Sequence, residues 1–109
     1  MNKTASPFFT LLIATMSLIA VVTLWRYNFI LTAALLILAV LMLSINKSKQ
    51  EIKTFIFCAF LGASAEAFAI TFNVWNYKNP NFIGIPLWLV LLWGIAAIFI
   101  IRLHSFFKN

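Results

Sequence analysis

Four long apolar segments dominate this chain and constrain what it can fold into. They run from Phe8 to about Trp25, from Phe29 to Ile45, from Thr54 to Phe72 and from about Ile85 to Ile101. About a quarter of the residues in a soluble domain are charged, whereas this chain has 9% charged and 64% hydrophobic residues. Such side chains cannot cover a water-facing exterior. We therefore predict that the outer surface of the protein contacts lipid.

The apolar segments are predicted to be membrane-spanning α-helices. Backbone groups in lipid must satisfy one another, and the strands of a barrel would alternate in polarity, which these segments do not. One helix from Phe8 to Ile45 would be about 57 Å long, nearly twice the hydrocarbon thickness, so the chain must turn back at residues 26–28. Pro86 marks a helix start, because proline in a first turn costs no hydrogen bond. We predict a single all-α domain over residues 1–109, an antiparallel four-helix bundle with helices at about 8–25, 29–45, 54–72 and 85–102.

The basic residues predict the orientation of this bundle. With four crossings, the two chain ends and the middle connector "NKSKQEIK" lie on one side of the membrane. That side carries Lys3, Lys47, Lys49, Lys53, Arg102 and Lys108, and the other side carries Arg26 and Lys78. Lysine and arginine concentrate on the cytoplasmic side of membrane proteins. We therefore predict a multi-pass protein of a bacterial inner (plasma) membrane, with the N- and C-termini in the cytoplasm.

Aromatic residues gather at the opposite, outer side of the predicted bundle. Trp25, Tyr27, Trp75, Tyr77 and Trp88 all fall near outer helix ends. Amphipathic rings favour the headgroup layer. We predict that these residues anchor the protein there, with Trp88 as an interfacial anchor at the start of the fourth helix.

The net charge of +6 does not indicate nucleic-acid binding, because the basic residues are scattered between apolar segments and form no patch. His104 has no second histidine with which to share a metal ion, and Cys58 is the only cysteine. We expect no metal, no cofactor and no nucleic acid. The expected partners are membrane lipid, a second copy of the chain, or other membrane proteins.

Glu66 is the only ionisable side chain well inside any predicted helix, and a carboxylate there is costly unless it is protonated or paired. On a helical wheel, small or amide side chains share its side, whereas Phe57 and Phe68 lie nearly opposite. The residues on its side are Ala59, Gly62, Ala63, Ala69 and Asn73. Small residues let a neighbouring helix approach closely. We therefore predict that Glu66 faces protein and that the two phenylalanines face lipid.

Depth in the membrane limits which side chains can contact Glu66. It lies about 10 Å from the outer end of its helix at Asn73, and Trp93 lies about 10 Å from the start of the next helix, so the two side chains can meet. The indole N–H of Trp93 is a suitable donor to the carboxyl, and Gly94 beside it would allow a close approach. Arg26, reaching in from the outer end of the first helix, is the alternative partner.

Structural roles are the alternative for each of these residues. A buried glutamate can be a protonated, hydrogen-bonded packing element, although ionisable groups in membranes are functional by default, and Trp93 can be a packing residue. Five hydroxyl residues can bond back to helix carbonyls and need no special role; they are Thr10, Thr15, Ser17, Thr32 and Ser64.

The segment "EAFAITFNVWNYKNPNFIGIPLWLVLLWG", residues 66–94, resembles small bacterial polytopic membrane proteins of unassigned function. In these, a membrane glutamate is followed by a W-x-Y turn and a G-x-P-x-W helix start. The segment is also faintly similar to carotenoid-biosynthesis membrane proteins, a resemblance that implies Glu66 acts as an acid on a polyene. Those enzymes are longer and carry a glycine-rich stretch that this chain lacks.

Small multidrug transporters resemble this chain in architecture, with four helices and one essential membrane glutamate, although theirs lies in the first helix. The sequence contains no paired carboxylates, no cysteine-histidine pair and no phosphate-binding loop. We expect an interaction or structural role through the small-residue surface around Glu66. A membrane enzyme acting on an apolar isoprenoid-type lipid and a small proton-coupled transporter are the two alternatives.

Overall fold

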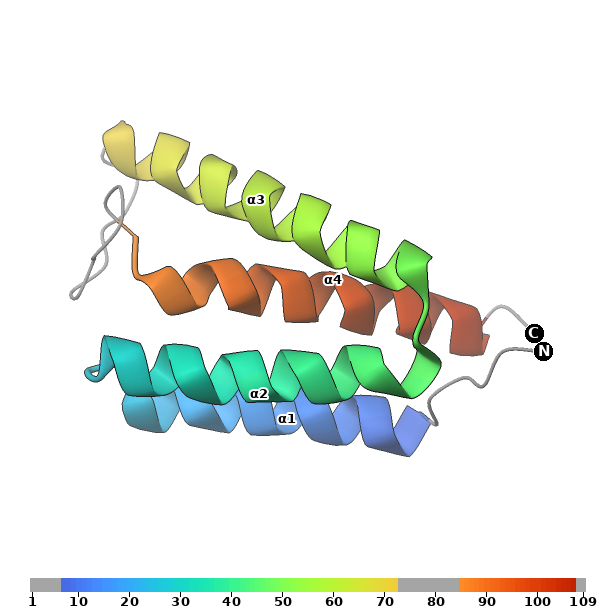
Figure 1. Ribbon diagram of the computed structural model, residues 1–109. Coiled ribbons are helices and arrows are strands. Elements are labelled where there is room, and N and C mark those ends of the chain that lie inside the picture. The colour runs from blue at the N-terminus through green and yellow to red at the C-terminus, as the bar shows by residue number, and fades with distance from the viewer. Residues whose placement is uncertain (1–6, 73–84, 108–109) are drawn as a thin grey trace.

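The computed structural model describes residues 7–72 and 85–107, and these residues form four α-helices (Figure 1). The helices are α1 (Pro7–Leu24), α2 (Asn28–Asn46), α3 (Lys49–Thr71) and α4 (Leu87–Phe107). Each is long and apolar enough to cross a membrane. The predictions of an all-α fold and of four candidate membrane-spanning helices are therefore confirmed.

Two helices are longer than the apolar segments from which they were predicted. α3 begins at Lys49, not at about Thr54, because the Ser48 side chain caps the helix by accepting a hydrogen bond of 3.2 Å from the backbone N–H of Glu51. α4 continues to Phe107 instead of ending at Arg102, since no glycine or proline interrupts it there. Both polar extensions belong to the same end of the molecule, so polar side chains there stand on helices and not on loops.

α4 is the central helix of the structure. It packs against α1, α2 and α3, whereas α3 makes its principal contacts with α4 alone. Figure 1 shows α4 between α3 on one side and the neighbouring pair α1 and α2 on the other. The first residues of α1 and the last residues of α4 lie at the end where α2 is joined to α3 (Figure 1). We call this end the connector end.

Short turns hold the helices in this order. Three residues separate α1 from α2, and Tyr27 closes that turn by donating its backbone N–H to Leu24 at 2.8 Å. Only Lys47 and Ser48 separate α2 from α3. Lys47 adopts a left-handed conformation with φ of 49° and donates to the carbonyl of Leu43, as helix C-caps commonly do.

The core lies where α4 meets α1 and α2. Its fully buried side chains are aliphatic and include Leu31, Leu35, Met42, Ile95 and Ile98. Large apolar side chains also cover much of the outer surface, on every helix. Since large apolar side chains lie both in the interior and on the described surface, burial of apolar groups away from water cannot by itself distinguish the two.

Trp88 differs from its prediction as an interfacial anchor. It is 6% exposed and belongs to the core cluster, because its position in the first turn of α4 points it toward the other helices. Tyr27 is exposed and Trp25 is half-buried, both at the opposite end from the connector end. Trp75 and Tyr77 lie outside the described residues.

Candidate functional site

The structure brings Glu66 and Trp93 together. The indole N–H of Trp93 donates to Oε2 of Glu66 at 3.3 Å, which joins α3 to α4. This is the contact that the depth argument predicts. Trp93 is 38% exposed and Glu66 is half-buried, so the pair lies at the edge of the helix contact and not in the core.

Gly62 provides the surface on which the Trp93 ring packs. A methyl group added at Gly62 would overlap the base of the Trp93 ring, at Cγ and Cδ2, so the indole packs directly against Gly62. Gly62 and Glu66 are four residues apart and share one face of α3. The ring therefore packs on Gly62 while its N–H reaches the carboxyl one turn further along.

A second glycine makes the reverse contact from α4. A Cβ atom added at Gly94 would lie 2.6 Å from the Phe55 ring, so this glycine provides space for an aromatic side chain of α3. We predicted that Gly94 lets the backbone approach near Glu66. Instead, each helix presents a glycine to an aromatic ring of the other, which fixes the register of α3 on α4.

The two faces predicted for α3 are present. Ala59, Gly62 and Ala63 are buried on the side of Glu66, and Ala69 is half-buried. Phe57 and Phe68 are exposed on the other side. Asn73, predicted on the same side as Glu66, lies outside the described residues.

Arg26 does not join this site. Its guanidinium carbon lies 5.2 Å from the centre of the Trp25 ring, in the turn between α1 and α2. Both Arg26 and Glu66 belong to the described part of the chain, and no ion pair joins them there. Of the two predicted partners of Glu66, the structure therefore contains the tryptophan.

Two adjoining hollows open beside the Glu66–Trp93 pair. The larger, of about 470 Å³, lies between α3 and α4, and we call it the α3–α4 groove. Its walls include the small residues Cys58, Gly62, Ala65, Ala96 and Ala97. The second hollow, of about 310 Å³, is lined by Glu66 with apolar residues of α4, and it shares Trp93 and Ala96 with the groove. A single carboxyl thus stands next to an otherwise apolar surface.

A second polar cluster lies at the connector end, around Arg102. Its guanidinium forms a two-bond ion pair with Glu51, Nε to Oε2 at 3.0 Å and Nη2 to Oε1 at 2.9 Å. It also donates to the Thr10 hydroxyl at 3.3 Å and to the Met42 carbonyl at 2.6 Å. Asn46 adds a bond of 3.2 Å to Oε2 of Glu51. We call these five residues the Arg102 cluster.

The Arg102 cluster connects all four helices. Thr10 belongs to α1, Met42 and Asn46 to α2, Glu51 to α3, and Arg102 to α4. Arg102 is 4% exposed and the Glu51 side chain 13%. Paired, side-on geometry is the strong form of an arginine-carboxylate contact, and a buried charge is tolerated only when it is paired and hydrogen-bonded.

These positions correct two predictions, one on ionisable side chains inside helices and one on Thr10. Glu66 is not the only ionisable side chain well inside a helix, since Arg102 lies within α4, which continues to Phe107. Arg102, one of the six basic residues assigned to the predicted cytoplasmic side, is buried and paired with Glu51. Thr10 binds Arg102, whereas Ser17 and Thr32 bond back to helix carbonyls as predicted.

One local signal could have located the acidic half of this cluster. Ser48 and Glu51 form the S-x-x-E pattern that opens helices, and the Ser48 half of that capping arrangement is present. It would have put Glu51 in the first turn of a helix. No local pattern pairs it with Arg102, which is 51 residues away.

Neither cluster provides a metal site. Among residues 7–72 and 85–107, no group of three or more His, Cys, Asp or Glu side chains is placed to hold a metal ion. His104 is exposed in the last turn of α4. The chemistry available in the described residues is therefore that of a hydrogen-bonded carboxyl beside an apolar groove and of a neutralised ion pair.

A family model described as "Protein of unknown function (DUF817)" matches residues 4–108. The chain belongs to this family. The match agrees with the resemblance to an uncharacterised family, and it does not bear on the W-x-Y turn or on carotenoid-biosynthesis proteins. No curated protein and no solved structure matches the chain significantly.

Proposed function

We propose that the protein is an antiparallel four-helix bundle of a bacterial inner membrane that binds a further membrane helix in its α3–α4 groove. The partner helix comes from a second copy of the chain or from another membrane protein. The short connections and the apolar outer surfaces of the helices support the membrane placement. The distribution of basic residues supports cytoplasmic termini.

The observation that carries the binding role is the composition of the groove. Small residues line both sides, Cys58 and Ala65 on α3 and Ala96 and Ala97 on α4, and the rest of the lining is Leu61, Gly62 under the Trp93 ring, Ile100 and Ile101. Helices in lipid associate through small residues because these allow close van der Waals packing without an apolar driving force. The groove therefore offers a third helix a surface of small residues for close packing, and it lies along the line where α3 and α4 meet.

Glu66 adds a polar element to the same surface. Its carboxyl accepts the Trp93 N–H at the junction of the two hollows. A hydrogen bond across helices in a membrane contributes about 0.6 to 2 kcal/mol. A free energy of this size can orient a partner helix but adds little to its affinity. We therefore assign Glu66 a role in the register of the partner and the small residues a role in its affinity.

Site-specific photocrosslinking tests this function. A photoreactive amino acid in place of Ala65, which is exposed at the groove, should give one adduct of defined mass in intact membranes. The matched control replaces Ala33, an exposed alanine on α2 outside the groove, and should give no defined adduct. Equal adducts at both positions, or none at either, would contradict a helix-binding groove.

The native cysteine then identifies the partner. Cys58 lines the groove and is half-buried, so a bismaleimide reagent should link two copies if the chain binds itself. An adduct of twice the 12.4 kDa chain mass identifies self-association. If the photoadduct forms and this product does not, the partner is a different membrane protein.

A membrane enzyme acting on an apolar isoprenoid-type lipid is the second candidate, and one observation favours it. Glu66 lines a hollow whose other residues are Leu89, Leu92, Trp93 and Ala96, so a carboxyl faces a site suited to an apolar chain. Glu66→Gln, described below, separates this candidate from the binding role.

A further inference from the structure

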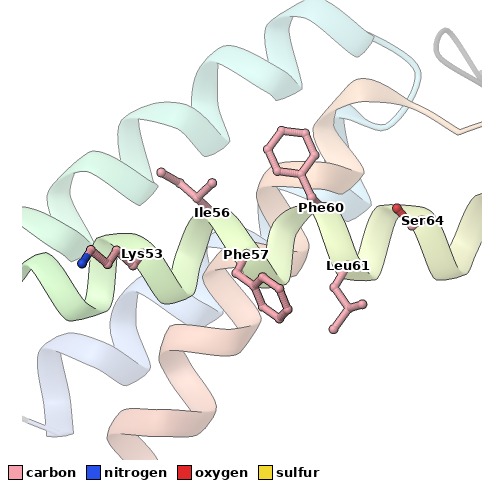
Figure 2. A pocket seen from close by; sticks show the side chains of 6 residues that line it. All are labelled: Lys53, Ile56, Phe57, Phe60, Leu61 and Ser64. Atoms are coloured by element: carbon pink, nitrogen blue, oxygen red, sulfur yellow. The ribbon is translucent and has the colours of Figure 1, made fainter.

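The outer face of α3 carries two continuous hollows, and of their lining residues Leu61 also borders the α3–α4 groove. The first, of about 590 Å³, is lined by four polar residues and one aromatic residue, which are Lys49, Gln50, Lys53, Thr54 and Phe57. The second, of about 440 Å³, is lined mainly by Ile56, Phe57, Phe60 and Leu61 (Figure 2). Lys53 and Phe57 line both hollows, so the two are continuous. The part around Lys49 and Lys53 is their basic end, and the part along Ile56, Phe57 and Phe60 is their apolar strip.

This face is uncovered in the folded chain. α3 makes its principal contacts with α4 through the opposite side, and Ile56, Phe57 and Phe60 are all exposed. Figure 2 shows Lys53 at one end of the strip and Ser64 at the other, along a single helix. In the proposed membrane bundle, the basic end reaches the connector side of the membrane and the strip runs into the hydrocarbon.

No carboxylate of α3 lies on the side of the helix that carries the two lysines of this face. Lys49 and Lys53 are four residues apart and therefore share one side of α3. Glu51, the acidic residue between them, points to the other side and is paired with Arg102. Because the Glu51 carboxylate is paired with Arg102, it does not neutralise the ammonium groups of Lys49 and Lys53.

We propose that this face binds one anionic phospholipid. The phosphate lies between Lys49 and Lys53, and an acyl chain follows Ile56, Phe57 and Phe60. Positive charge next to an apolar strip complements a lipid with a negative headgroup, whereas a free phosphate ion would use only the polar half. This proposal depends on the membrane placement proposed above, and its site shares Leu61 with the edge of the α3–α4 groove.

Lipid titration of the detergent-solubilised protein tests the proposal. Native mass spectrometry should show one phosphatidylglycerol bound to the wild type, and much less phosphatidylcholine with the same acyl chains. Each lysine near a membrane surface contributes about a five-fold gain in affinity for anionic lipid, so Lys49→Gln with Lys53→Gln should weaken binding about thirty-fold. Lys47→Gln removes the same charge from an exposed residue outside the hollow and should leave binding near the wild-type value.

Three results would overturn the site. One is an equal loss in the Lys47→Gln control, which would indicate a general charge effect. Another is equal retention of phosphatidylcholine, and the third is complete displacement of the lipid by excess inorganic phosphate, which would indicate a phosphate site only. The double variant should still enter the membrane and still give the Ala65 photoadduct, so failure here is distinguishable from failure of the proposed function.

Discussion

Removing one member of the buried ion pair should destabilise the protein more than any change at its surface. Arg102→Met deletes both bonds to Glu51 and those to Thr10 and the Met42 carbonyl. Breaking a buried pair by removing one partner costs about 3 to 5 kcal/mol. Glu51 keeps its bond from Asn46 and is 13% exposed, so we expect the lower end, about 3 kcal/mol.

The opposite deletion should cost more. Glu51→Leu leaves a guanidinium that is 4% exposed and cannot lose its proton. Within residues 7–72 and 85–107, this guanidinium then keeps only the Thr10 and Met42 acceptors. We expect about 5 kcal/mol for Glu51→Leu. Arg102→Met combined with Glu51→Leu should cost less than the sum, because the double variant leaves no unpaired charge.

Reversible unfolding in mixed micelles, with SDS as the denaturant, measures these free energies. Arg26→Met is the matched control: Arg26 is exposed and contacts only the Trp25 ring among described partners, a contact of about 0.5 to 1 kcal/mol. The argument fails if Arg102→Met lies within that range, or if the two single changes add in the double variant. Either result would show that the cluster does not hold the four helices together.

Three further predictions concern orientation, packing and Glu66. Reporter fusions after Lys49 and at the C-terminus should report the cytoplasm, and one after Lys78 the periplasm; an external C-terminus would exclude the proposed orientation. Gly62→Leu should cost about 1 to 3 kcal/mol, because the new side chain meets the base of the Trp93 ring, whereas the exposed Phe57→Leu should stay within about 0.5 kcal/mol; equal losses of folded protein would mean that the faces of α3 are reversed. Glu66→Gln keeps an acceptor for the Trp93 N–H, so abundance should be normal, whereas Glu66→Ala removes that acceptor and should cost about 1 kcal/mol; a fully active Glu66→Gln protein in a strain with a deletion phenotype would exclude both the enzyme and the proton-coupled transporter.

Residue patterns within single helices predicted much of the Glu66 site. The 100° rotation per residue placed Glu66 with Gly62 and Ala63 and away from Phe57, and the structure has them so. A rise of 1.5 Å per residue placed Glu66 and Trp93 at one level, where they form a hydrogen bond. The prediction succeeded because α3 and α4 are neighbours in both chain order and space.

The same reasoning could not find the Arg102 cluster. Arg102 meets Glu51, Met42 and Thr10 across separations of 51, 60 and 92 residues. Such contacts depend on how far each helix is rotated about its own axis, which no periodicity within one helix specifies. The polar residues around Lys49 and after Arg102 also predict helix ends, although α3 begins at Lys49 and α4 continues to Phe107.

The sequence by itself determined that the chain forms four long apolar helices and which face of α3 meets protein. Hydropathy and period decide these features because backbone hydrogen bonds and side-chain direction are local properties of a helix. Only the tertiary structure decided that Trp88 is buried, that glycines on α3 and α4 receive each other's aromatic rings, and that Arg102 joins Glu51. These outcomes depend on how the four helices are placed relative to one another. A buried charge must be paired and interior space must be filled, and the residues that do so come from segments far apart in the chain.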